Sequence, residues 1–140
     1  MRQSHTTFTV RTRGQGFYEI TSDVVRWLQA EGVSLGQVTL FCRHTSAGLT
    51  IQENADPDVL RDLAEFLKRL VPEGASWYRH VDEGPDDMPA HIRATLSGVS
   101  LAIPVVQGRL VLGTWQGIFL CEHRQMPHTR QVVGYLIGEG

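Results

Sequence analysis

The chain alternates short strand-like segments with only a few helical ones, and this pattern restricts it to an α+β fold. Seven segments are predicted as strands because they alternate apolar and polar residues or favour β-branched types. These segments are residues 5–12, 17–20, 37–44, 49–52, 100–106, 110–121 and 131–137. Within the 110–121 segment, Gly113 and Gly117 indicate bulges or a close approach of another backbone.

Capping residues and apolar spacing predict two helices and a third, shorter one. The first follows the capping side chains of Thr21-Ser22-Asp23 and stops at Gly32. The second has Asp56 at its N-cap and Pro57 in its first helical position, with apolar residues at helical spacing up to residue 70. The third covers residues 88–96 and is followed by Gly98.

These elements predict a single domain over residues 1–140. Its length is enough to bury a core, and its 41% hydrophobic and 20% charged residues are typical of a globular protein. No linker, repeat or low-complexity tract divides it. We therefore expect an α+β fold in which two to three helices cover an antiparallel β-sandwich or barrel-like sheet.

The formal charge of −2 excludes a general electrostatic attraction to nucleic acid or to a membrane surface. No run of 18 apolar residues is present, and the N-terminus lacks an apolar signal region. Two cysteines do not make a disulfide framework. We expect a cytoplasmic protein that binds neither nucleic acid nor membrane.

The densest group of reactive side chains lies in residues 79–91. This segment holds two histidines and four carboxylates, together with prolines and a glycine that restrict the backbone. Crowded like charges repel one another unless a cation or a retained proton relieves the repulsion. The segment therefore predicts a metal site or a polar ligand site. Solvated carboxylates are the alternative, and either Asp86 or Asp87 is expected to cap the third helix.

Four motifs in this order resemble the YjbQ-like family, whose members are often labelled secondary thiamine-phosphate synthases. The motifs are His44-Thr45-Ser46-Ala47, Glu53-Asn54-Ala55-Asp56-Pro57, Asp86-Asp87-Met88-Pro89-Ala90-His91, and Gly113-Thr114-Trp115-Gln116-Gly117-Ile118 followed by Glu122-His123-Arg124. The resemblance covers nearly the whole chain. It implies a small homotrimeric α+β protein with a histidine-lined site that can hold a metal, and a weak thiamine-phosphate synthase activity.

With this resemblance, the histidines predict a metal centre. We expect His80, His91 and His123 to converge on one divalent cation through neutral imidazole nitrogens. Zinc suits three imidazoles and leaves a coordination position open, and magnesium is the second candidate. The alternative for His123 is a buried histidine that only satisfies local partners.

The other motif residues are predicted to handle a small anionic or phosphorylated metabolite. Hydroxyls and backbone amides suit Thr45 and Ser46 to an anion, although an ordinary turn explains them equally. The remaining substrate-binding candidates, each with a structural alternative, are Asn54, Gln116 and Arg124. The candidate catalytic residues are His44, Glu53 and Asp87.

Two Cys-x-His pairs, at Cys42 with His44 and at Cys121 with His123, make a four-ligand zinc site conceivable, but two thiols packed in the core explain the cysteines better. Two classes of function remain open. The first is a metal-dependent enzyme, whose thiamine-phosphate synthase activity is secondary to another reaction. The second is a non-catalytic trimeric module that binds a metal or a metabolite. The absence of a P-loop and of a dinucleotide fingerprint argues against standard nucleotide enzymes.

Overall fold

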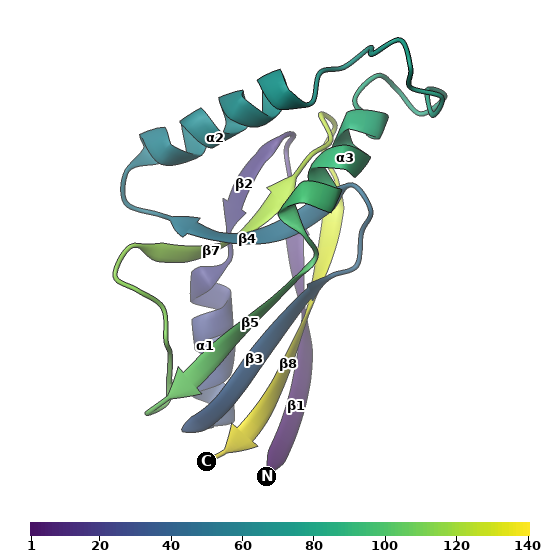
Figure 1. The fold of residues 1–140 in the computed structure, drawn as a ribbon. Coiled ribbons are helices and arrows are strands. Elements are labelled where there is room, and N and C mark those ends of the chain that lie inside the picture. Colours follow the sequence, from purple (N-terminus) through teal and green to yellow (C-terminus); the bar gives the residue numbers. More distant parts are fainter.

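Eight strands form two antiparallel sheets, and three helices surround them (Figure 1). The larger sheet has the order β1-β8-β3-β5-β6, and the smaller has the order β2-β7-β4. The computed structural model describes residues 1–140. The strands are β1 (Arg2–Arg11), β2 (Gly16–Glu19), β3 (Leu35–Cys42), β4 (Ala47–Glu53), β5 (Ser100–Val106), β6 (Arg109–Leu110), β7 (Gln116–Glu122) and β8 (Thr129–Glu139). The helices are α1 (Thr21–Glu31), α2 (Pro57–Leu70) and α3 (Asp87–Ser97). The α+β class and the helix-covered antiparallel sheets are confirmed.

The first and last strands are neighbours in the larger sheet. β1 pairs with β8 from Arg2 opposite Gly138 to Arg11 opposite Thr129, and β8 pairs on its other side with β3. Both ends of the chain therefore lie at the same end of the molecule (Figure 1).

The core lies between the larger sheet and α1, and it extends to the smaller sheet. Val38, Leu40 and Cys42 alternate along β3 and are all buried, as the sequence predicts. Helix α1 contributes the buried residues Val24 and Leu28. These side chains belong to one cluster of 15 buried hydrophobic residues drawn from both sheets and α1. Contacts among these side chains hold the two sheets and α1 together.

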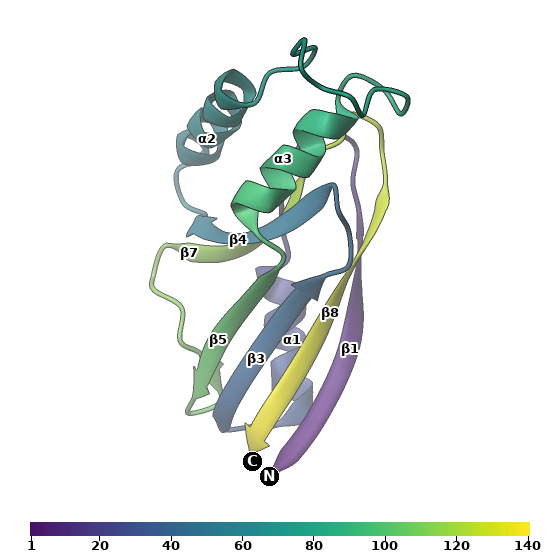
Figure 2. The same cartoon turned by 45° about the vertical axis from the view of Figure 1, so that its right-hand side comes forward.

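The smaller sheet carries the other two helices. In Figures 1 and 2, α2 and α3 lie on the side of this sheet that faces away from the larger sheet. Helix α2 begins as predicted, with Pro57 first and the Asp56 carboxylate accepting a hydrogen bond from the Asp58 amide at 2.9 Å. None of its residues is buried. No helix is both long and apolar enough to cross a bilayer.

Two sequence predictions about element boundaries are wrong. Helix α1 starts at Thr21 behind Ile20, which makes no side-chain cap. Thr21 Oγ1 instead bonds the Glu19 carboxylate and accepts from the Ile118 amide, because β2 leads directly into the helix beside β7. The predicted strand over 110–121 is two strands, since residues 111–115 leave the sheet between β6 and β7.

Two glycines permit close packing at the smaller sheet. A Cβ on Gly117 would lie 2.7 Å from Glu19 Oε2, so side chains approach this glycine closely, and not another backbone as the sequence predicts. A Cβ on Gly48 would lie 2.5 Å from the Gly98 carbonyl oxygen and would also clash with Ser97. The end of α3 therefore rests directly on the backbone of β4.

Candidate functional site

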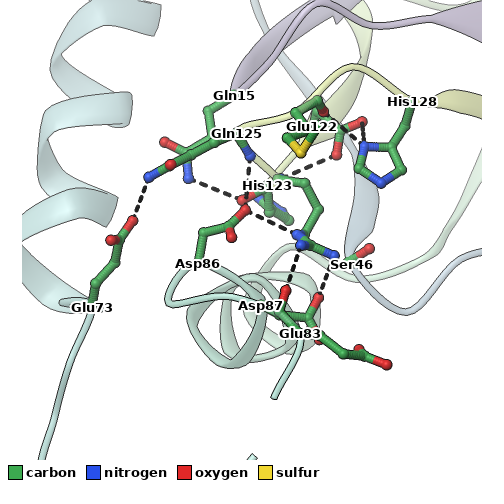
Figure 3. A network of polar contacts seen from close by, with 12 residues as sticks. Gln15, Ser46, Glu73, Glu83, Asp86, Asp87, Glu122, His123, Gln125 and His128 are labelled. Carbon is green, nitrogen blue, oxygen red and sulfur yellow. Dashed lines mark hydrogen bonds and ion pairs between the residues drawn. The ribbon is translucent and has the colours of Figure 1, made fainter. Parts of the chain in front are cut away.

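The acidic segment folds around one guanidinium. Arg124, just after β7, donates from Nε to Asp86 Oδ2 at 2.9 Å and places Nη1 2.8 Å from Asp87 Oδ1. Its Nη2 donates to the Glu83 carbonyl at 2.9 Å. Figure 3 shows Asp86, Asp87 and Glu83 together at the start of α3. All three guanidinium nitrogens therefore bind the loop, so Arg124 positions the acidic segment and has little capacity left for a substrate anion.

The sequence predicts that Asp86 or Asp87 caps α3, but neither side chain does so. Asp86 occupies the N-cap position without a side-chain capping bond. Its Oδ2 accepts from Arg124 and from the Gln125 amide at 2.9 Å instead. Asp87 is the first helical residue and is 2% exposed. A charged partner and a backbone amide outside the helix satisfy the Asp86 carboxylate better than one amide of its own helix, because charge-assisted bonds are the stronger ones.

Two predicted histidines meet Asp87 in one group. Asp87 and His91 are four residues apart on α3, so their side chains lie on the same face of the helix. Asp87 Oδ2 lies 3.1 Å from His91 Nε2 and 2.6 Å from His80 Nε2, which reaches it from the preceding loop. The ligand atoms of His80, Asp87 and His91 all lie within 4.8 Å of one another. The segment from residue 80 to 91 thus assembles a three-donor group by itself.

A backbone contact orients His91. Its Nδ1 lies 2.9 Å from the Thr45 carbonyl oxygen, which can only accept a hydrogen bond. Nδ1 therefore carries a proton, and in the neutral ring the Nε2 lone pair faces Asp87. Two electron-rich atoms at this distance need a proton or a cation between them. This arrangement, with Nδ1–H on a carbonyl and Nε2 free, is also how metal-binding histidines are held.

The group is electrostatically polarised. Burial alone would raise the pKa of Asp87, but its hydrogen bond with His80 and the Arg124 charge outweigh burial and hold the pKa below its usual range. The same hydrogen bond to Asp87 raises the pKa of His80. The hydrogen bond thus favours the charged form of both groups, a carboxylate facing an imidazolium proton. A divalent cation could replace that proton.

His123 is not part of this group, contrary to the expected three-imidazole centre. Its side chain is 3% exposed, and its Nε2 lies 3.3 Å from Ser97 Oγ at the far end of α3. Burial lowers the pKa of His123 to about 4, so the ring is neutral. The last residues of β7 are buried, and the His123 ring that follows them lies beneath α3. The third potential metal ligand, beside His80 and His91, is therefore the Asp87 carboxylate.

The His44-Thr45-Ser46 motif mostly serves the fold. His44 Nε2 accepts from the Gln131 amide at 2.8 Å, so this nitrogen is not available as a base. The Ser46 hydroxyl is buried and lies 3.0 Å from Arg130 Nη2. Thr45 reaches the candidate centre through its carbonyl, not through its hydroxyl. His44 Nε2 and the Ser46 hydroxyl are both engaged in hydrogen bonds within the fold, so neither is free to bind an anion.

Glu53, Asn54 and Gln116 lie away from the histidines. In the β4–β7 pair, Glu53 is opposite Gln116 at one end, and Ala47 is opposite Glu122 at the other. The six steps from Ala47 to Glu53, at ~3.3 Å each, separate these ends by about 20 Å. Their side chains have local partners: the Asp56 amide for Glu53, Glu19 for Asn54 and the Gly113 amide for Gln116. The antiparallel register therefore separates these predicted residues from His80, Asp87 and His91.

The sequence did not predict the buried ion pair between Glu122 and Arg130, which lies next to the site. Glu122 is 2% exposed and Arg130 is 4% exposed. Arg130 Nε donates to Glu122 Oε1 at 2.8 Å, and the Thr12 hydroxyl donates to the same oxygen at 2.6 Å. Arg130 alternates with Val132 and Leu136 on the inward face of β8, and this alternation in the sequence could have revealed it.

Both cysteines are free thiols in the core, so no four-ligand zinc site forms with them. Burial raises the pKa of Cys121 to about 12, and burial also raises the pKa of Cys42. A thiol that does not ionise is a poor metal ligand and a poor nucleophile. The core-packing interpretation of the cysteines is confirmed.

Comparisons with known proteins agree on one family. The model for UPF0047 protein YjbQ-like matches residues 6–139. A Synechocystis relative, UPF0047 protein sll1880, is 54% identical over 99% of this chain and 94% of its own length. YjbQ from Escherichia coli O157:H7 is 42% identical over 95% of this chain and 96% of its own.

Solved structures show the same fold. An uncharacterised YjbQ/UPF0047 protein from Clostridium acetobutylicum superimposes with a TM-score of 0.87 at 40% identity, over 94% of this chain and 99% of its own. A hypothetical protein from Aeropyrum pernix gives 0.88 at 34% identity, over 97% and 99%. With matches over nearly its whole length in sequence and in fold, this chain belongs to the YjbQ/UPF0047 family.

Proposed function

We propose that this protein is a metal-dependent enzyme that acts on a small anionic or phosphorylated metabolite, and that His80, Asp87 and His91 hold the metal. The observation that carries the proposal is the convergence of two imidazole nitrogens and one buried carboxylate oxygen within 4.8 Å. Asp87 is 2% exposed; Arg124 binds its Oδ1, and its Oδ2 is the oxygen that faces both imidazole nitrogens.

The donor set fits a transition metal. Two imidazoles and one carboxylate suit zinc and related ions better than magnesium, which prefers oxygen ligands. Ligands at ~2.0–2.1 Å from a tetrahedral zinc lie roughly 3.3 Å apart, close to the 3.1 Å between Asp87 Oδ2 and His91 Nε2. His80 Nε2, now at hydrogen-bond distance of 2.6 Å from the same oxygen, would move outward by about 0.7 Å to bind the metal. Arg124 and the Thr45 carbonyl hold Asp87 and His91 in place, as outer partners do in metal sites.

A metal ion here would leave at least one coordination position open, where it could polarise a phosphoryl oxygen or lower the pKa of bound water. The chain's own residues supply the surroundings. Glu83, 65% exposed and 3.4 Å from His80 Nε2, lies beside the centre. Arg124 offsets the charge of Asp86 and Asp87, which would otherwise repel an anionic substrate.

Two candidate activities share this chemistry. A thiamine-phosphate synthase-type reaction, as the sequence resemblance implies, requires stabilisation of a leaving pyrophosphate. Hydrolysis of a phosphate ester requires an activated water. A non-catalytic metal- or metabolite-binding module is favoured instead by His44 and Ser46, whose reactive groups are engaged within the fold. Turnover that a chelator abolishes supports the enzyme, and binding without turnover supports the module.

Removing a donor should abolish stoichiometric metal binding. We expect one Zn²⁺ per chain for the natural sequence, and affinity reduced at least ~100-fold in Asp87→Asn and in His80→Gln, since changes even to outer partners of metal sites cost 10–100-fold. The measurement is a competitive titration with a chromophoric chelator at constant pH. The His80 side chain is 42% exposed, so His80→Gln tests the donor without disturbing the core.

Asp82→Asn is the matched control. Asp82 lies in the same acidic segment, is exposed, and its replacement removes the same charge as Asp87→Asn. Its zinc affinity should equal that of the natural sequence, whereas Mg²⁺ should not compete at millimolar concentration. Equal zinc affinity in all three variants, or no stoichiometric binding in any, would show that these residues hold no metal.

We also propose that the chain forms the homotrimer that the sequence resemblance implies. Helix α2 supports this because it buries no residue of its own, and its Phe66 and Leu70 are 57% and 54% exposed on one helical face. Light scattering should give three times the 15.7 kDa mass of the chain. Phe66→Glu with Leu70→Glu should give the monomer mass, and the exposed Arg61→Glu should not. A monomeric natural sequence would contradict the trimer.

A further inference from the structure

A cavity of about 460 Å³ lies between α2 and the β2–β7 edge. Its walls come from one face of α2, from the start of β2, from the end of β7 and from Arg93 of α3. Sites for small molecules commonly occupy about 300–1,000 Å³. None of the proposed metal donors, His80, Asp87 and His91, lines this cavity.

Arg93 gives the cavity its chemistry. Its side chain is 6% exposed, and its Nε has no hydrogen-bond acceptor. Only its Nη2 has a protein partner, the Val71 carbonyl at 3.2 Å. No carboxylate lies within ion-pair distance of Arg93, whereas every other buried arginine or aspartate forms an ion pair with a group of opposite charge. A buried guanidinium without a counter-ion is strongly unfavourable, and it keeps its proton in proteins.

The other charged groups around the cavity do not neutralise Arg93. Glu122 lines the cavity, but Arg130 and Thr12 already bind its carboxylate. His123 lines it as a neutral, 3%-exposed ring. The charged residues of α2 on the rim are exposed and carry both signs: Arg61, Asp62, Glu65 and Lys68. Glu73 is near enough to favour the charged form of Arg93, but it forms no ion pair with it and accepts a hydrogen bond from Gln125 instead. The buried part of the cavity therefore has a positive charge with no contacting counter-ion, beside a neutral imidazole.

The cavity and the histidine–aspartate group lie on different faces of α3. His91 and Arg93 are two positions apart, which turns them roughly 200° around the helix. Asp87 and His91 share one face, and Arg93 shares the other with Ser97, whose hydroxyl contacts His123. Binding in the cavity therefore does not require the metal donors.

We propose that this cavity binds a small organic anion whose carboxylate or phosphate group pairs with the Arg93 guanidinium. The guanidinium fork matches both kinds of oxygen anion. The apolar part of the ligand would lie against Phe17 and Leu67, which line the same space. His123 would supply a neutral hydrogen-bonding edge beside the anionic group. This site shares no residue with the proposed metal centre, so evidence against one of the two sites would not be evidence against the other.

Titration of the full-length protein with inorganic phosphate and, separately, with malonate tests the proposal. At pH 7 and constant ionic strength, saturable amide NMR shifts should appear at residues 15–17 and 121–123, together with the Arg93 Nε–H signal. Sodium chloride serves as the ionic-strength control and should give no saturable shift. Tighter binding of phosphate identifies a phosphorylated ligand, and tighter binding of malonate identifies a carboxylate.

Two variants assign the binding to Arg93. Arg93→Gln should weaken the anion at least tenfold, and it should fold because it removes an unpaired buried charge. Arg26→Gln removes the same charge from an exposed position on α1 and should bind as the natural sequence does. No saturable shift with either anion, or equal affinity in Arg93→Gln and the natural sequence, would overturn the proposal.

Discussion

Replacing Arg130 with methionine is expected to lower the free energy of unfolding by about 3–5 kcal/mol. The change leaves the Glu122 carboxylate, which is 2% exposed, without its main cation. It also removes the bond from Arg130 to Ser46 Oγ, which ties β8 to the start of β4. Urea unfolding followed by circular dichroism at pH 7 measures the loss.

Two further variants separate the charge effect from packing. Adding Glu122→Leu to Arg130→Met removes both charges and should recover part of the loss, because a buried pair contributes little relative to apolar residues of similar volume. Arg69→Met breaks the pair with Glu65 at 2.8 Å, whose arginine is 79% exposed, and should cost far less stability because solvent screens this pair. If the Arg130→Met and Arg69→Met losses were equal, the buried pair would have no special role.

Acid should destabilise the fold through His123 before the carboxylates titrate. Burial lowers the pKa of this histidine from 6.5 to about 4. As the pH falls below 6.5, His123 takes up a proton in the unfolded chain, whereas in the folded chain it stays neutral until the pH reaches about 4. The free energy of unfolding should therefore fall by about 3 kcal/mol across this window, at 1.36 kcal/mol per unit of pKa. At pH 7 this histidine makes no such contribution.

Denaturant unfolding of the natural sequence and of His123→Gln between pH 7 and pH 4 measures this effect. The variant should lose less stability between pH 7 and pH 4 than the natural sequence does, so the two curves should differ in slope over this range. His80, whose pKa is raised, acts in the opposite sense: its ion pair stabilises the fold below pH 6.5 and is lost at higher pH. Since both proteins contain His80, Asp87 and Glu122, their difference isolates His123. Parallel curves would contradict the prediction.

The parts of the site that the sequence predicts are those encoded within a short stretch. His80, Asp87 and His91 all belong to residues 79–91, and Asp87 and His91 are brought together by the helical repeat alone. Helix α2 is likewise predictable because Asp56 and Pro57 are local start signals. Such features need no knowledge of tertiary contacts.

The parts that the sequence misses depend on long-range packing. The predicted convergence of His123 with the other histidines is replaced by burial under α3, since the direction of a ring at a strand end depends on what covers it. The separation of Gln116 from the histidines follows from the β4–β7 register, which no spacing in the sequence reveals. The helix cap expected from either Asp86 or Asp87 does not form, because Asp86 binds Arg124, which is 38 residues away in the sequence.

The pairing of β1 with β8 has a consequence for synthesis of the chain. β8 lies between β1 and β3, so before β8 is synthesised β1 has no hydrogen-bonded neighbour and β3 is paired on one side only, with β5. Contacts between residues so distant in the sequence also slow folding, because a long loop must close before they form. The nascent chain therefore exposes these unpaired strand edges until β8 has been synthesised, and chaperones that mask such edges should matter most for this protein at that stage.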